Sequence, residues 1–597
     1  MSGGEPNRGL INFVIITTII LLILGVPVYL GMGGGMVMSY GPEYWTYMLH
    51  PKQLIMTYYL YLFDPAYAGA MAAQPFMVKA KLFGPPAAGG FFGLLTLFFA
   101  RAPLFDFRPL QAAESIHGDA RWATEAEIRR ANLRSKQGVL MGRTGKNYLV
   151  ADDFQHILLF APTGSGKGVG FVIPNLLYYT HSVVCHDIKM ENYELTSGYR
   201  ANVLKQACYT WNPADPNGIT NCYNPLDWIS DKPGQMVDDC QKICNLILPE
   251  QEFWQNEARS LMLGVMLYLC AVPEKLTSFG EIVRTMRSDD VVYNLAVVLD
   301  TVGGRIHPVS YMNIAAFLQK ADKERSGVIS TMNSGLELWA NPLIDTATAT
   351  SDFDVQQLKK QLMTVYVGVT PDNLQRLEPL LKVFYQQATD FLTRSMPGPD
   401  ETHGVMFMMD EFPSLGEMPQ FQIGIAYFRG FKVKLFLIVQ DTQQLKGIYE
   451  EAGMNSFLSN SYYRVTYSAN NIETANMISQ MVGNKTVIQE SSNKPTFVDF
   501  NPASRTKHIS ETQRALLLPQ EVIQLPRDEQ IILVESFSPI KCNKIFYYKD
   551  STFTKRLMDK IPLPVQEPYD PRAKKDAKEP EKPADASAGA AGAPRKT

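Results

Sequence analysis

Hydrophobic residues gather in long runs near the N-terminus and in short, regularly spaced runs from about residue 110 onward. Residues 11–31 form an uncharged apolar run, and about 20 such residues cross a bilayer core as a helix. A second run, 83–100, is shorter and rich in glycine. Between them, Leu54–Phe63 is too short to span a membrane, which favours an interfacial or periplasmic position. We therefore predict an N-terminal membrane anchor over residues 1–110, with two spans and a periplasmic loop.

A cleavable signal peptide is the alternative for the first run, but its apolar core would be shorter and a small-x-small cleavage site would follow. Here the run is long, and glycine and methionine follow it. Two spans place both termini on one side of the membrane, and the flanking arginines favour the cytoplasm for that side. Lysines in the intervening loop weaken this preference.

After the anchor, short apolar runs alternate with helical stretches, which is typical of an α/β fold with a parallel sheet covered on both faces. The predicted strands are His156–Phe160, Ser182–His186, Met363–Val369, Val405–Met409, Val433–Val439 and Tyr463–Tyr467.

The alternation stops between about residues 230 and 345, where helical periodicity continues without a convincing strand. Phe253–Val272, for example, has an apolar stripe at helical spacing. We predict an all-α domain over 230–345, inserted between two parts of the α/β domain, 111–229 and 346–560.

Composition narrows the class of protein further. The chain is 46% hydrophobic and 19% charged, which excludes a wholly disordered polypeptide. The net charge of −3 is unlike that of proteins that coat duplex DNA, so a nucleic acid would be held by a local patch or a channel. The seven cysteines form no CxxC pair, which indicates free thiols in a reducing compartment. We predict that the C-terminal tail, 561–597, is disordered, because from Pro571 it lacks large apolar residues.

A glycine-rich loop follows the first predicted strand and precedes a helix that begins near Phe171. It differs from the phosphate-binding pattern G-x-x-x-x-G-K-[ST] at Ala161 and at Gly168, where that pattern has the metal-binding hydroxyl. A strand–helix turn that binds nothing is the alternative, but the flanking strand and helix favour ATP binding. The predicted nucleotide-binding residues are Thr163, Gly164, Ser165, Gly166, Lys167, Gly168 and Val169.

Gly168 leaves the first ligand of Mg²⁺ open. Thr163 or Ser165 could supply an oxygen, or the metal could rely on water and a carboxylate.

Two adjacent acids, Asp410 and Glu411, follow the buried strand Val405–Met409. Alone this arrangement is most often a solvated strand end, but with a phosphate loop on an earlier strand it predicts the carboxylates of an ATPase. Asp410 would hold Mg²⁺ through a water, and Glu411 would polarise the attacking water. A nucleotide site also favours the cytoplasm for this part of the chain, because ATP is found there.

Two further polar residues fit an ATPase sheet. Gln440 ends the strand Val433–Val439, so it would face the γ-phosphate. Arg429 could reach a neighbouring subunit's nucleotide as an arginine finger, although a surface salt bridge is the alternative.

Many of these segments, in the same order, resemble the type IV secretion system coupling proteins of the TraG/TraD type, the membrane-anchored ATPases of bacterial conjugation. The resemblance runs from about His117 to Asp550, and it rests on the segments His117–Ala123, Ala161–Leu177, Asp187–Thr196, Tyr223–Asp227, Phe253-Trp254, Ser326–Ser330, Asp410–Gly416, Val439–Leu445, Leu516–Val522 and Tyr547–Asp550.

The resemblance implies more than the residues do by themselves. It implies a RecA-like motor domain with an all-α domain, using ATP and Mg²⁺, in a homo-hexameric ring at the bacterial inner membrane. It implies that the protein binds a relaxase–DNA complex with single-stranded DNA, or effector proteins, and passes them to the secretion channel subunits. By position, Lys167, Asp410, Glu411, Arg429 and Gln440 match the family's nucleotide-site, finger and sensor residues.

Two other functions compete with this one. An FtsK-like DNA translocase would have a long linker and a terminal DNA-reading domain, and neither is present in this sequence. A cargo receptor that does not hydrolyse nucleotide would have no use for a water-activating acid at Glu411.

Overall fold

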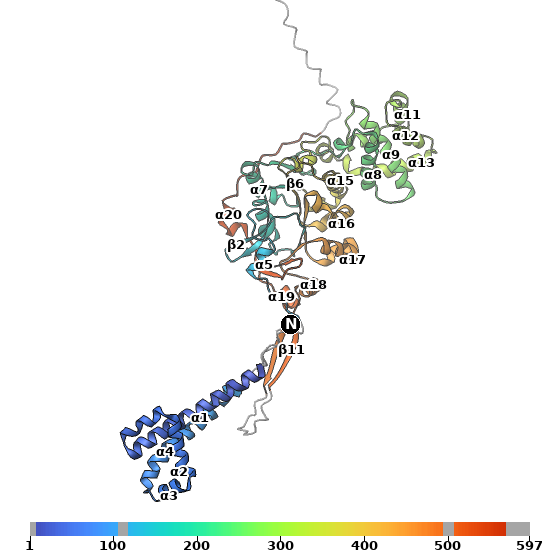
Figure 1. The fold of residues 1–597 in the computed structure, drawn as a ribbon. Helices are drawn as coiled ribbons and strands as arrows, with labels where there is room; N and C mark the ends of the chain where they lie inside the picture. The colour runs from blue at the N-terminus through green and yellow to red at the C-terminus, as the bar shows by residue number, and fades with distance from the viewer. Residues whose placement is uncertain (1–7, 106–117, 493–506, 569–597) are drawn as a thin grey trace, which may run out of the picture. The chain divides into compact units, whose positions relative to one another are not determined.

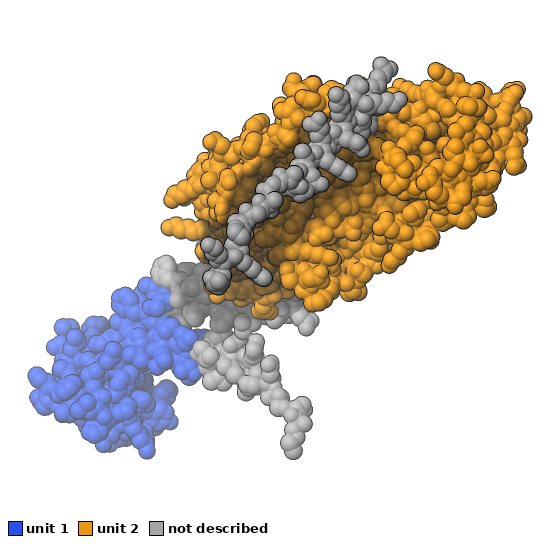
Figure 2. Space-filling model, turned by 90° about the horizontal axis from the view of Figure 1, so that it is seen from above, with its two compact units in different colours: residues 1–114 blue, residues 115–597 orange. Residues whose placement is uncertain are grey.

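The computed structural model describes residues 8–105, 118–492 and 507–568. The chain divides into two compact units, an N-terminal unit, Met1–Glu114, and a C-terminal unit, Ser115–Thr597 (Figures 1 and 2).

The N-terminal unit is helical, and its long helices α1 and α4 pack side by side (Figure 1). Its elements are α1 (Arg8–Tyr40), η1 (Pro42–Leu49), α2 (Pro51–Phe63), α3 (Pro65–Ala72) and α4 (Phe76–Phe105). The predicted spans lie in α1 and α4, and Leu54–Phe63 lies in α2. In the described part of the chain, one helix, Thr18–Tyr40, is long and apolar enough to cross a membrane. The second predicted span has no such support.

Glycines bring α1 and α4 into very close contact. A Cβ placed on Gly31 would lie 2.5 Å from the Pro85 carbonyl oxygen, and one on Gly89 would lie 2.3 Å from the Pro27 carbonyl oxygen. As the residue number rises along α1 it falls along α4, so the two helices are antiparallel. Small residues that let helix backbones approach are typical of helix pairs in membranes, where apolar burial alone gives little driving force.

We expect Gly89→Leu to force α1 and α4 apart and to destabilise the N-terminal unit by about 1–3 kcal/mol, the usual cost of overpacking. The measurement is the fraction of full-length protein that stays monodisperse in detergent after heating. Gly84→Leu is the matched control, because a Cβ on Gly84 meets no atom within 4 Å in the part of the chain that the structure describes. Equal losses for the two variants would contradict the close packing at Gly89.

One mixed sheet organises the C-terminal unit, and all six predicted strands belong to it. Its order is β2-β1-β13-β12-β9-β3-β8-β7-β4-β6-β5. The bounds are β1 (Val139–Thr144), β2 (Asn147–Ala151), β3 (Ile157–Phe160), β4 (Ser182–Asp187), β5 (Ala207–Trp211), β6 (Met363–Gly368), β7 (Val405–Met409), β8 (Val433–Val439), β9 (Tyr463–Thr466), β12 (Glu529–Val534) and β13 (Ile540–Asn543).

The prediction of a parallel sheet holds for only part of the observed sheet. In the part of the sheet with the order β9-β3-β8-β7-β4-β6-β5, neighbouring strands pair in parallel. Beyond β9, the strands β12, β13, β1 and β2 extend the sheet with antiparallel pairs. Short connections join β1 to β2 and β12 to β13, which antiparallel neighbours allow and parallel neighbours do not. A separate two-stranded ribbon is formed by β10 (Asn484–Ser492) and β11 (Lys507–Ala515).

Helices cover both faces of the central strands. Along β3, Leu158 and Phe160 enter one core cluster while Ile157 and Leu159 enter the other, as expected for a strand buried on both sides. The helices of this part are α5 (Glu125–Arg130), α6 (Ile173–Leu176), α7 (Glu191–Asn202), α15 (Leu374–Thr393), α16 (Pro419–Gly424), α17 (Thr442–Asn460), α18 (Ile472–Val482), α19 (Pro519–Ile523) and α20 (Ser551–Thr554).

The stretch from 233 to 347, described throughout, is helical and without strands, and most of its helices form a lobe beside the sheet (Figure 1). These helices are α8 (Pro233–Ile247), α9 (Phe253–Cys270), α10 (Phe279–Met286), α11 (Val291–Val302), α12 (Pro308–Leu318), α13 (Asp322–Gly335) and α14 (Pro342–Ala347). The fold is therefore RecA-like with an inserted all-α domain.

The predicted tail begins too early. Residues 561–568 lie along the C-terminal unit, where Val565 forms a β-bridge with Ile219 and the Gln566 amide donates a hydrogen bond to the Gly218 carbonyl, 2.8 Å away. Their apolar side chains give this segment something to bury, unlike the composition that begins at Pro571. The rest of the predicted tail, 569–597, lies outside the described residues.

Candidate nucleotide-binding site

The glycine-rich loop leaves β3 at Ala161 and enters a π-helical turn, η2 (Gly168–Val172), before α6. Gly164 has φ 77° and Gly166 has φ 85°, a backbone region that only glycine adopts without strain. The Gly170 amide donates to the Gly166 carbonyl over 2.7 Å, which closes the start of the turn. A loop of this form presents successive backbone N–H groups to an anion. The helix predicted from Phe171 therefore begins as a wider turn.

The sheet register brings the predicted residues to one edge. Phe160, the last residue of β3, lies opposite Val439, and Met409, the last residue of β7, lies opposite Leu437. The residues that follow these strands, including Asp410, Glu411 and Gln440, therefore meet the glycine-rich loop at the carboxyl edge of the sheet. This edge is where open α/β sheets bind their ligands.

Direct contacts join four of the predicted residues. The Lys167 ammonium lies 3.2 Å from Asp410 Oδ1 and also forms an ion pair with Glu411. Gln440 Nε2 donates a hydrogen bond to Glu411 Oε1 over 2.7 Å. Glu411 itself is held at φ 60°, a left-handed conformation that costs a non-glycine residue roughly 1–2 kcal/mol. Backbone strain of this kind clusters at functional sites, because there it aims a side chain.

Electrostatics at this edge favour a charged lysine. Burial alone would lower the pKa of Lys167, but the charges of Asp410 and Glu411 outweigh it and raise this pKa. Burial raises the pKa of Asp410, and the Lys167 ammonium offsets part of that rise. The lysine therefore keeps its positive charge between the loop and the carboxylates.

The oxygen groups around the loop suit a magnesium ion. Asp410 offers a carboxylate, and the buried Ser165 hydroxyl has no hydrogen-bond partner among the described residues, whereas Thr163 is exposed. Mg²⁺ prefers such oxygen ligands together with water and phosphate. A Cβ on Gly168 would meet no atom of the described residues within 4 Å, so this position is open although it lacks a hydroxyl. Val169, the last predicted loop residue, lies inside η2.

Arg429 lies apart from the other predicted residues. It sits in a short turn before β8, at the amino edge of the sheet, where its guanidinium donates a hydrogen bond to Gln155 Oε1 over 3.0 Å. Gln440 follows the other end of β8. Seven strand residues, Val433–Val439, rise about 20 Å in all, so Arg429 cannot reach the nucleotide site of its own chain.

Sequence reasoning missed two charged residues at the site. Asp187 ends β4, next to Asp410 in the register, and burial raises its pKa to about 7. Lys544, buried after β13, donates a hydrogen bond to the Ser165 carbonyl over 3.2 Å, and burial lowers its pKa to about 8. Asp187 belonged to a segment that carried the family resemblance, so it could have been found, but nothing marked Lys544.

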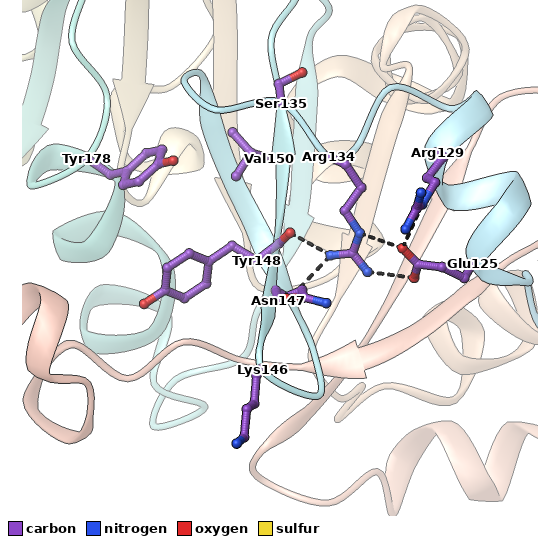
Figure 3. Close-up of a pocket in the computed structure, with 9 residues that line it drawn as sticks. All are labelled: Glu125, Arg129, Arg134, Ser135, Lys146, Asn147, Tyr148, Val150 and Tyr178. Carbon is purple, nitrogen blue, oxygen red and sulfur yellow. Dashed lines mark hydrogen bonds and ion pairs between the residues drawn. The ribbon is translucent and has the colours of Figure 1, made fainter.

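A separate cavity of about 520 Å³ lies at the β1–β2 hairpin. Arg134 projects into it and is held by Glu125 and by the backbone of β2, while the rings of Tyr148 and Tyr178 lie on the other side (Figure 3). None of the predicted site residues lines this cavity.

Comparison with known proteins places these features in a family context. The family model for type IV secretory system conjugative DNA transfer matches residues 121–566. A VirD4 protein of Rhizobium radiobacter is 32% identical over 471 residues, which are 75% of this chain and 67% of that protein. A conjugal transfer protein TraG of Escherichia coli is 29% identical over 513 residues, which are 76% of this chain and 80% of that protein.

Solved structures of the conjugative coupling protein TrwB have a similar fold. One, determined with sulphate, superposes with a TM-score of 0.55 at 14% identity and covers 78% of this chain and 100% of its own. Another, determined with ADP and Mg²⁺, has a TM-score of 0.54 at 14% identity and covers 77% of this chain and 100% of its own.

Proposed function

We propose a function for this chain from one premise: it belongs to the type IV secretory system conjugative DNA transfer family. We infer that it is the coupling ATPase of a conjugation system, which hydrolyses ATP to drive cargo into a secretion channel. The observation that carries this proposal is the meeting of Lys167, Asp410, Glu411 and Gln440 at the carboxyl edge of the sheet, beside the glycine-rich loop.

Each side chain has a task in this proposal. The amides of the loop and the Lys167 ammonium bind the phosphates, and Asp410 with Ser165 would hold Mg²⁺. A bound Mg²⁺ would neutralise charge that develops on the transferred phosphoryl group. Glu411 accepts a hydrogen bond from the attacking water and orients it, while Gln440 holds the carboxylate in place.

The proposal extends to the assembly. An arginine that cannot reach its own site fits a ring in which Arg429 enters the site of the next subunit, and we propose a homo-hexamer. We further propose that the ring receives a relaxase–DNA complex with single-stranded DNA, effector proteins, or both, and delivers them to the channel subunits. The names of the VirD4 and TraG relatives support this direction.

We also propose that the N-terminal unit anchors the ring in the bacterial inner membrane, with the ATPase in the cytoplasm. The apolar helix Thr18–Tyr40 supports one span. A second span in α4, which packs closely against α1, stays a prediction. We keep the predicted division at residues 110, 229 and 345 as part of this proposal.

The test is transfer of a marked plasmid from cells that carry Lys167→Ala protein, with membrane levels checked by blotting. We expect transfer to fall by at least a hundredfold, because the phosphates lose their charged ligand. Lys205→Ala, which removes an exposed lysine outside the site, should transfer normally. Normal transfer with Lys167→Ala would contradict the motor role for DNA. Secretion of protein effectors would then be measured in the same cells.

A further inference from the structure

The order of the strands fixes the direction in which a bound nucleotide must run. The glycine-rich loop follows β3, which has β8 on one side and β9 on the other. Asp410 and Glu411 follow β7, beyond β8, and Lys167 points to them. Since the lysine of such a loop reaches the β- and γ-phosphates, the triphosphate end lies toward β8 and β7. The base must therefore leave the loop on the side of β9.

A segment from the far end of the chain lies on that side of the loop. It follows β13, which is joined to β9 through β12 in the sheet. A Cβ on Gly166 would lie 3.5 Å from the Phe546 ring, and one on Gly170 would lie 3.8 Å from it. The short helix η10 (Tyr547–Lys549) also contacts η2. The Phe546 ring thus lies beside Gly166 and Gly170, in the loop and turn that would hold the phosphates.

The aromatic side chains of this segment are accessible. Phe546 is half-buried, and Tyr548, whose ring centre lies 5.8 Å from that of Phe546, is 51% exposed. The Lys549 ammonium lies 5.0 Å from the centre of the Phe546 ring. Exposed aromatic rings beside a cation are the surface on which nucleic acid bases stack. Lys544 and Tyr467, by contrast, are buried beneath the loop and support it.

We propose that Phe546, with Tyr548 beside it, stacks on the base of the bound nucleotide. This inference rests on the proposed function, and it identifies the residues of the same site that would bind the base of the nucleotide. Stacking uses the π-face that every base has, so it favours large purine bases over pyrimidines without distinguishing adenine from guanine.

The experiment compares two probes, ATP and inorganic tripolyphosphate, by their affinity for the full-length protein in the presence of Mg²⁺. We expect Phe546→Ala to weaken ATP binding about 5- to 100-fold and to change tripolyphosphate binding less than about twofold, because only ATP has a base to stack. Phe546→Trp should restore ATP affinity to within about threefold of the original. Tyr311→Ala, which removes a half-exposed ring from the all-α domain, should change neither affinity.

Each other result overturns the inference. An equal loss for both probes would mean that Phe546 only supports the glycine-rich loop. Unchanged ATP affinity in Phe546→Ala would mean that the base lies elsewhere. If the unaltered protein bound neither probe, the nucleotide site itself would be wrong, and the proposed function would fall together with this inference.

Discussion

Glu411→Gln protein should bind ATP about as tightly as the unaltered protein and hydrolyse it about 100 to 1,000 times more slowly. The amide keeps the size of the side chain and an oxygen that can accept the hydrogen bond from Gln440, so the site should keep its shape. It cannot take up a proton from the attacking water, and a positioned general base usually contributes about 10²- to 10⁴-fold to a rate. Steady-state hydrolysis and equilibrium binding of a fluorescent ATP analogue, measured on purified protein, check both halves of this expectation.

The matched control is Glu417→Gln, an exposed glutamate six residues further along the chain. It should hydrolyse ATP at the normal rate. If Glu411→Gln also kept its rate, the carboxylate would be structural, and the reading of the chain as a cargo receptor that only binds nucleotide would gain support. Plasmid transfer from cells with normal membrane levels of Glu411→Gln protein should fail for the same reason as hydrolysis.

Arg429→Ala protein by itself should hydrolyse almost no ATP. Mixing it with Lys167→Ala protein, which is inactive for a different reason, should restore part of the hydrolysis. An arginine finger contributes about 10³- to 10⁵-fold to phosphoryl transfer. In rings reassembled from equal amounts of Arg429→Ala and Lys167→Ala chains, about a quarter of the interfaces would join an intact loop to an intact finger. Hydrolysis should therefore recover to about a quarter of the original rate, whereas each variant alone stays near zero.

Two controls make this mixing experiment specific. Arg527→Ala, an exposed arginine elsewhere in the C-terminal unit, should leave the rate unchanged. Arg429→Lys should recover little, because a lysine lacks the planar fork that binds a phosphate through two hydrogen bonds. No gain on mixing would contradict action in trans and leave Arg429 as the surface partner of Gln155.

The central strands were predictable because both of their faces are buried, which leaves short apolar runs such as Val405–Met409 with the same bounds in sequence and structure. Strands toward the two ends of the sheet, such as β1 and β5, were missed, because they mix polar and apolar residues and give no such run. Their places depend on pairing with strands hundreds of residues away, as when Arg143 meets Asn543. The local pattern of polar and apolar residues therefore could not predict this strand pairing.

The candidate site, too, could be predicted only in part from the sequence. Lys167, Asp410, Glu411 and Gln440 follow strands in a recognisable order, so sequence spacing alone indicated that they would meet. The strained backbone of Glu411 could not be predicted, since glutamate has no preference for that conformation. Nor could the contact of Lys544 with the loop, because a strand hairpin late in the chain delivers it.

The glycine contacts between α1 and α4 bear on how the proposed membrane anchor would insert during synthesis. The first helix is apolar enough to partition into lipid by itself, whereas α4 carries prolines and glycines along its length. A helix of that kind gains its place by pairing with a neighbour whose backbone it can touch. In the proposed anchor with two spans, α1 and α4 would insert as one antiparallel pair, in which α1 supplies the surface against which α4 packs. On this view, replacing α1 by an unrelated apolar helix would leave the anchor hydrophobic enough but unable to retain its second helix.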